Sequence, residues 1–157
     1  MSTEHLKGAV YALYRSTSES ERNEANKWLM GFAATHEAWE AARALLAEQE
    51  QDIQYFGAHL LFLKVRSEWH GLADDFKSSV YAGVRQMIRQ LGWAQEPCSW
   101  HRLSPGVKRL CLVLAAAAVR SSAAPAFVTE ALAIAYEPGG APVAVEMLAA
   151  LPQVSLA

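Results

Sequence analysis

The chain has 157 residues, of which 52% are hydrophobic and 19% charged, and its formal net charge is −2. This composition is too apolar and too weakly charged for a disordered chain, and the length suits one compact unit or a short stack of repeats. With 14 basic against 16 acidic side chains, the chain lacks the basic surplus of a nucleic-acid-binding protein, so we expect no direct nucleic-acid partner.

The spacing of the apolar residues predicts an all-α protein. Apolar side chains recur every three or four positions, Ala and Leu dominate, and runs of strand-type Val, Ile and Thr are scarce. The predicted helices cover residues 5–14, a second segment that ends near 34, and then 37–48, 53–69, 72–91, 105–119, 125–136 and 141–151.

Polar residues at the breaks predict where several of these helices begin. Ser18 or Ser20 is expected to cap the second helix, and Thr35 the third. Ser104 followed by Pro105 is typical of a cap and a first-turn proline, so the sixth helix is predicted to begin there.

The segment 53–69 follows the acidic, Gln-rich break 48–52 and is apolar on nearly all sides, interrupted by Lys64. A helix of that kind packs on more than one side. The helices divide into pairs at 5–34, 36–69, 72–119 and 125–151, and the second helix of each pair is the more apolar. This favours HEAT-like antiparallel pairs stacked as a right-handed solenoid, with an irregular helical bundle as the alternative.

Catalytic and metal-binding patterns are incomplete throughout the sequence. His36 and Glu40 are four residues apart but have no third ligand beside them, and Cys98 and Cys111 do not have a metal-type spacing. There is no Gly-rich phosphate loop, and the longest apolar stretch, 110–119, is too short to cross a membrane. We therefore expect no enzyme, no cofactor, no metal and no membrane partner, and a soluble intracellular protein; a helical enzyme would need a pocket with converging titratable groups.

Several strings resemble the N-terminal end of the importin-β superfamily. They are 25–30 (ANKWLM), 38–40 (AWE) with the leucines at 45 and 46, 53–58 (IQYFGA) with Lys64 and Trp69, and 108–111 (KRLC). The resemblance is collinear from about Tyr11 to Pro152 and is greatest to the importin-thirteen branch, then to transportin-SR. The sequence departs from the family pattern in a Trp-rich connection at 92–103 and in four consecutive alanines at 115–118.

The resemblance implies part of a much longer HEAT-repeat nuclear transport receptor that shuttles between cytoplasm and nucleus. Its implied partners are Ran in its GTP form, phenylalanine-glycine nucleoporins and protein cargo, and a helical adaptor unrelated to Ran is the alternative. In the family, the second helices of the first repeats contact Ran, while first helices offer grooves to nucleoporins. The residues that this assigns to Ran binding are Lys27, Met30, Lys64, Lys108 and Arg109.

The large residues of the apolar stripes are predicted to be structural anchors rather than ligand platforms. They are Trp28, Leu29, Trp39, Phe56 and Leu60. Trp28, Trp39 and Phe56 are expected to lie between the first two helix pairs, and charge reversal at Lys64 is expected to weaken Ran binding without changing the melting temperature.

Overall fold

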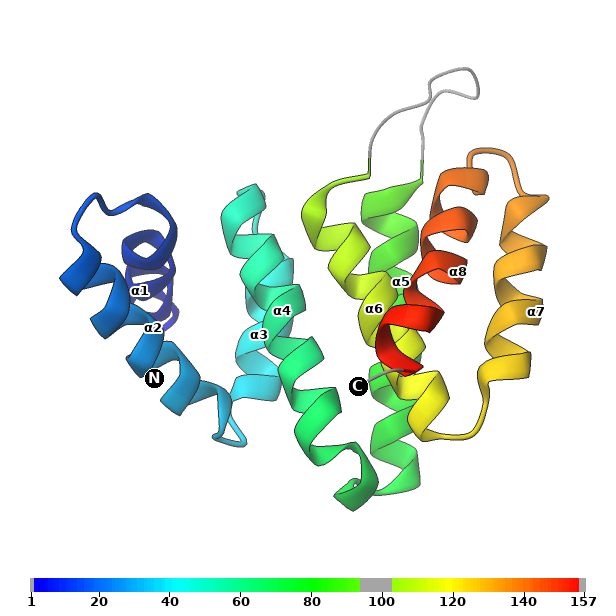
Figure 1. Ribbon diagram of the computed structural model, residues 1–157, viewed down its shortest axis with the longest axis horizontal. Coiled ribbons are helices and arrows are strands. Elements are labelled where there is room, and N and C mark those ends of the chain that lie inside the picture. Colours follow the sequence, from blue (N-terminus) through cyan, green and yellow to red (C-terminus); the bar gives the residue numbers. More distant parts are fainter. Residues whose placement is uncertain (1, 94–102, 156–157) are drawn as a thin grey trace.

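The computed structural model of the chain describes residues 2–93 and 103–155 and contains only helices and turns in these ranges (Figure 1). The helices are α1 (Thr3–Arg15), α2 (Glu19–Ala33), α3 (Ala38–Leu46), α4 (Gln51–Glu68), the 3-10 turn η1 (Trp69–Gly71), α5 (Asp74–Gly92), α6 (Pro105–Arg120), α7 (Ala124–Ala135) and α8 (Ala141–Ser155). The predicted all-α class is confirmed. Cys98 and most of the Trp-rich connection lie outside the described residues.

Consecutive helices pack as antiparallel pairs, and the pairs stack side by side (Figure 1). The even-numbered helices form the nearer layer in this view, in which α4 packs on α6 and α6 on α8. This arrangement is a helical-repeat solenoid, and the predicted stack of HEAT-like helix pairs is confirmed.

The centre of the packing is α6, which contacts α4, α5, α7 and α8. Ala115–Ala118 are all buried there, because only small side chains let helices approach on several sides at once. A polar side chain in this run would be buried, which costs free energy unless it forms a hydrogen bond. The α3–α4 contact is equally close, since a Cβ atom at Gly57 would lie 3.0 Å from the Ala42 carbonyl oxygen.

Two of the predicted helix caps are confirmed and one is wrong. Ser18 accepts a hydrogen bond from the Glu21 amide at the start of α2, and Ser104 accepts one from the Val107 amide at the start of α6. Thr35 does not cap α3. Its hydroxyl instead donates to the Phe32 carbonyl at 2.8 Å, because a short turn of 34–37 places it beside the last carbonyls of α2.

The first pair is joined to the others differently from the rest. Helix α1, which buries Leu6 and Val10, packs mainly on α2 and also contacts α4, whereas α2 has little contact with α4. The even-numbered row is therefore continuous from α4 to α8, and α2 diverges from it (Figure 1).

Candidate functional site

The cationic side chains of α1 and α5 differ in their partners from those of the even-numbered helices, whereas Arg43 on α3 has no carboxylate partner within the described ranges. On α1 and α5, ion pairs with a carboxylate oxygen at 2.5 to 3.7 Å are formed by Lys7, Arg15, Lys77, Arg85 and Arg89. On α2, α4 and α6, Lys64 is the only cation with such a partner within the described ranges. The even-numbered cations without a carboxylate partner there are Arg22, Lys27, Arg66, Lys108, Arg109 and Arg120.

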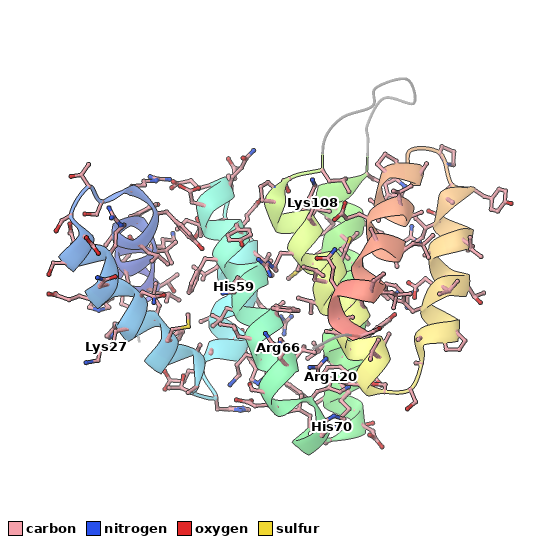
Figure 2. The ribbon with its side chains drawn as sticks, in the orientation of Figure 1. Lys27, His59, Arg66, His70, Lys108 and Arg120 are labelled. Atoms are coloured by element: carbon pink, nitrogen blue, oxygen red, sulfur yellow. The ribbon has the colours of Figure 1, made fainter. Side chains whose placement is uncertain are left out.

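These side chains give the even-numbered layer a positive face. Figure 2 shows Lys27 on α2, Arg66 on α4, and Lys108 and Arg120 at the two ends of α6. The first turn of α2 is acidic and the exposed Glu24 lies one turn before Lys27, so the cations gather mainly at the C-terminal end of α4 and along α6. Unneutralised charge of one sign attracts acidic partners and steers their approach.

The ends of α4 and α6 bring two arginines to the same part of this face. Arg66 and Arg120 belong to the last turns of these two helices, which pack together. The indole Nε1 of Trp69, just after α4, donates to the Ser121 hydroxyl just after α6 at 2.9 Å and ties the two ends. His70 lies in the same region in Figure 2.

Four of the five predicted Ran contacts lie on the even-numbered layer at or near the surface. Lys27 and Lys108 are exposed, and Met30 is 38% exposed. Arg109 is half-buried at the seam of α4 and α6, where its guanidinium donates to the Tyr55 hydroxyl at 2.7 Å. The guanidinium also lies 5.3 Å from the ring centre of Phe62, so its position is fixed by packing.

His59 lies beside this seam on α4, where it stacks on Tyr55 with ring centres 6.2 Å apart. Burial, and to a lesser degree the charge of Arg109, lowers the pKa of His59 below its ordinary value of 6.5. The imidazole is therefore neutral at pH 7, and the positive charge of this face comes from arginine and lysine side chains.

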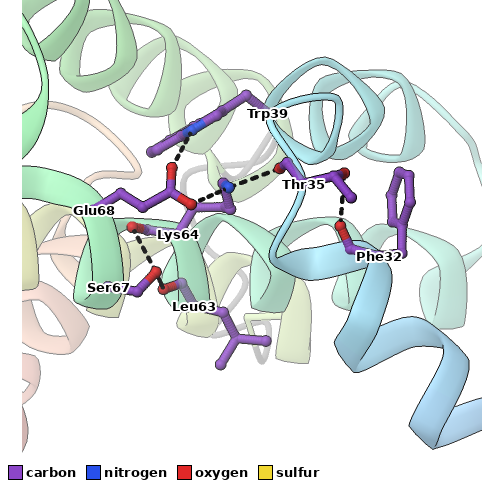
Figure 3. A network of polar contacts seen from close by, with 7 residues as sticks. All are labelled: Phe32, Thr35, Trp39, Leu63, Lys64, Ser67 and Glu68. Carbon is purple, nitrogen blue, oxygen red and sulfur yellow. Dashed lines mark hydrogen bonds and ion pairs between the residues drawn. The ribbon is translucent and has the colours of Figure 1, made fainter.

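The structure changes the interpretation of Lys64, which is only 1% exposed (Figure 3). Its ammonium donates to the Thr35 carbonyl at 2.8 Å and is paired with Glu68 one turn further along α4. Glu68 also accepts from the Trp39 indole at 3.1 Å. All of these partners belong to the chain itself, so the Lys64 ammonium is not presented to a partner.

The predicted anchors are placed as follows. Leu29, Trp39, Phe56 and Leu60 are buried, and Trp28 is half-buried. Trp28 does not lie between the first two pairs, because α2 diverges from α4; it contacts His5 and Phe32 within the first pair instead. Trp39 packs edge-on against Phe76 of α5, toward the third pair.

The odd-numbered helices carry grooves rather than a continuous packed row. One groove lies between α1 and α3, one between α3 and α5, and one between α5 and α7. The groove between α3 and α5 is lined mainly by apolar side chains, among them Trp39, Phe76, Val80 and Met87. These odd-numbered helices are spread apart because the even-numbered ones pack more closely.

Within the described residues, no group of three or more His, Cys, Asp or Glu side chains is arranged to hold a metal ion. None of the described helices combines the length and the apolar character that a membrane span requires. Cys111 is buried in α6.

Comparison with known proteins finds that this chain is similar to proteins named Importin-13. No family model matches the chain. It is 31% identical over 121 residues to Importin-13 of Bos taurus and of Homo sapiens, which covers 74% of the chain. Importin-13 homolog A of Dictyostelium discoideum is 26% identical over 121 residues, or 76% of the chain. These matches support a relationship to the importin-β family.

The chain spans 11% of the length of these Importin-13 relatives. Their similarity agrees with the resemblance seen in the sequence, and the expected similarity to transportin-SR stays a prediction.

Three side chains of the positive face were missed by sequence reasoning: Arg66, Arg120 and Tyr55. Arg66 and Arg120 each lie in the last turn of a helix. The helix dipole favours a basic residue there, so its presence does not by itself indicate a binding site. The usable signal was their equivalent position in the second helices of neighbouring pairs, which brings them together once those helices pack side by side.

Proposed function

We propose that this chain is the N-terminal, Ran-binding segment of a nuclear transport receptor that carries protein cargo through the nuclear pore. The observation that carries the proposal is the positive, internally unpaired face of α2, α4 and α6 in a chain similar to Importin-13. Such a receptor shuttles between cytoplasm and nucleus, and Ran·GTP governs the binding or release of its cargo.

The even-numbered layer binds Ran through charge complementarity. Lys27, Lys108, Arg66 and Arg120 meet acidic side chains of Ran, and Arg109, held by Tyr55, lies at the centre of the contact. Met30 adds apolar area beside Lys27. Lys64 acts indirectly, because its ammonium fixes the turn that joins α2 to α3.

Discrimination between GTP and GDP needs no nucleotide site on this chain. The switch segments of a small GTPase are ordered by the γ-phosphate and its Mg²⁺ and are released after hydrolysis. A packed row of helices shaped to the ordered switches binds that state more tightly, and coupling to cargo follows from differential affinity.

The odd-numbered side offers the corresponding site for phenylalanine-glycine nucleoporins. The groove of Trp39, Phe76, Val80 and Met87 lies between α3 and α5 and has a mainly apolar lining. A phenylalanine ring is the ligand chemistry that such a lining favours.

The test is binding of the chain to Ran loaded with GTP or with GDP, measured by calorimetry at fixed ionic strength. We expect tighter binding to the GTP form and a large loss for the double variant Arg66→Glu/Arg120→Glu. The matched pair of single variants is Arg66→Glu and the control Arg43→Glu on α3, each of which reverses one exposed charge, the control on the odd-numbered side. Equal affinity for both nucleotide forms would contradict the proposal and favour an adaptor unrelated to Ran.

A further inference from the structure

The first helix pair is attached to the rest of the solenoid at two places that differ in chemistry. One is the covalent turn 34–37 between α2 and α3, braced by the hydrogen bond from Lys64 to the Thr35 carbonyl. The other, at the opposite end of α3, is a cluster of polar side chains between α1 and the break 48–52. Its members, which we call the polar latch, are Lys7, Tyr11, Arg15, Glu48, Glu50 and Asp52.

The latch residues of α1 form one stripe, because Lys7, Tyr11 and Arg15 follow each other at intervals of four. Lys7 pairs with Glu48 at 2.6 Å, and the Tyr11 hydroxyl donates to Glu50 at 2.6 Å.

Arg15 completes the latch at the end of the stripe. Its guanidinium donates to Glu50 at 2.8 Å and to Asp52 at 3.0 Å, and it also lies over the Tyr11 ring at 4.4 Å. Arg15, Tyr11, Glu50 and Asp52 thus form one connected network, and Lys7 with Glu48 forms a separate ion pair beside it.

The latch adds to an apolar contact that is smaller than the contacts between the later pairs. The α4–α6 and α6–α8 contacts run along whole helices, whereas the first pair meets α4 through a shorter contact of α1 and a slight contact of α2. On this pair Met30 is 38% exposed, and Tyr14, although 40% exposed, packs edge-on against Tyr55 and Phe56 of α4. Arg15 and Glu50 are 51% and 50% exposed, so dissolved salt screens this part of the latch, whereas the Lys7 side chain is 16% exposed and is screened less.

We propose that the polar latch sets the angle between the first helix pair and the other helices, with the turn 34–37 as the hinge. When the latch is intact, α2 lies where Lys27 and Met30 align with the positive face of α4 and α6. When salt or mutation weakens the latch, the first pair rotates away about the hinge. The effect on Ran binding rests on the proposed function, whereas the rotation itself does not.

The expected movement is large enough to measure. A helix of the length of α2 is about 22 Å long, so a rotation of about 15° at the hinge moves its far end by about 6 Å. Spectroscopic labels at Asn23→Cys on α2 and Gln90→Cys on α5, both exposed positions, would report it in a Cys98→Ser background.

At about 0.01 M salt, the distance between these labels should be short and narrowly distributed. At about 1 M salt it should be longer and more broadly distributed, because the Debye length falls from about 30 to about 3 Å between the two concentrations. The variant Glu50→Gln/Asp52→Asn should show the long, broad distribution already at low salt. The matched control is Glu130→Gln/Glu137→Gln, which removes the same charge and the ion pairs that Arg85 and Arg89 of α5 form with Glu130 of α7 and with Glu137 just after α7.

Charge exchange separates the latch from a general loss of stability. Lys7→Glu should lengthen the distance by placing a second carboxylate against Glu48, and Lys7→Glu/Glu48→Lys should restore it. Circular dichroism should show unchanged helicity in each variant.

Equal label distances at both salt concentrations and in the Glu50→Gln/Asp52→Asn variant would overturn the proposal. The measurement needs no partner, so this outcome is independent of Ran binding. If the distances respond as expected while Ran fails to bind, the latch stands and the proposed function fails.

Discussion

At the scale of single residues, Lys64 explains how a charged side chain can lie inside an apolar helix. Its ammonium is compensated by Glu68, by the Thr35 carbonyl and by the Trp39 ring, whose centre lies 5.7 Å away. Thr35 is 29 positions away in the sequence. A lysine within an apolar run is compatible with a surface contact or a buried pair, and only the tertiary partners decide between them.

Replacing Lys64 by Met should therefore lower the free energy of unfolding by about 1–3 kcal/mol, because the Thr35 carbonyl loses its donor while the volume is kept. Lys64→Glu should cost more, since it sets two carboxylates side by side. Urea denaturation measures both. Lys27→Glu, at an exposed position, should stay within about 0.5 kcal/mol of the wild type. A wild-type midpoint for Lys64→Glu would show that the ammonium is not buried.

Cys111 is expected to be inert in the folded protein. Burial, with a smaller contribution from Glu146, raises the pKa of its thiol to about 12, so the reactive thiolate is scarce at pH 8. In a Cys98→Ser background, a thiol reagent should label Cys111 only after urea unfolds the chain. Rapid labelling of the native protein would mean that α6 is more open than its packing indicates.

At the scale of helices, burial decides how much each large side chain contributes to the free energy of unfolding. Phe56 of α4 is fully buried between helices, and Trp28 of α2 is half-buried at the outer side of the first pair. Phe56→Ala should lower the free energy of unfolding by about 3–5 kcal/mol, and Trp28→Ala by clearly less. Thermal and urea unfolding of the two variants give the comparison. Equal losses would place Trp28 in the core.

The helices themselves were accessible from the sequence, because each carries an apolar stripe and two carry caps that the structure also has. Ser18 and Ser104 cap their helices through the neighbouring backbone, which is a local effect. Thr35 was misjudged because the turn 34–37 is so short that its hydroxyl reaches back to α2. Trp28 was misjudged because the divergence of α2 from α4 is a tertiary property.

At the scale of the whole molecule, the positive face was only partly predictable. Lys27, Met30, Lys108 and Arg109 were selected through family resemblance, whereas Arg66 and Arg120 become neighbours only when α4 packs on α6. The cations on α1 and α5 are paired with carboxylates, whereas most cations of the even-numbered helices, in the part of the chain that the structure describes, are not. These pairs depend on carboxylates that lie as far as 48 positions away in the sequence.

Stability should fall in acid through three carboxylates. Hydrogen bonds from Tyr11 and Arg15 lower the pKa of Glu50, and those from Arg89 lower the pKa of Glu137. Burial alone would raise the pKa of Glu68, but the hydrogen bonds from Lys64 and Trp39 have the larger combined effect, so the pKa of Glu68 is lowered.

Each carboxylate therefore stabilises the fold fully above its ordinary pKa of 4.5, and this contribution is lost as the pH falls through the lower folded-state pKa. Urea midpoints at pH 5, 4 and 3 should decrease in that order. The triple variant Glu50→Gln/Glu68→Gln/Glu137→Gln should start lower and depend less on pH.

His59 should produce a separate decline at higher pH. Its folded-state pKa lies below the ordinary 6.5, so unfolding takes up a proton below that value and the folded state loses stability as pH falls through the folded-state pKa. Midpoints measured between pH 7.5 and 5.5 should fall for the wild type and stay nearly level for His59→Phe. A decline retained in that variant would assign it to another histidine.

The central position of α6 also determines how the backbone opens. The amides of α6 lie among α4, α5 and α8, and most side chains from Val107 to Ala118 are buried. The hydrogen bonds of these amides therefore break only when most of the molecule unfolds. The amides of α1 and α2, whose helices have a smaller contact with the remainder, open at lower cost. Hydrogen–deuterium exchange should therefore proceed from the N-terminal pair inward, with α6 the last helix to exchange its protons, and added salt should accelerate exchange in the first pair while leaving α6 protected.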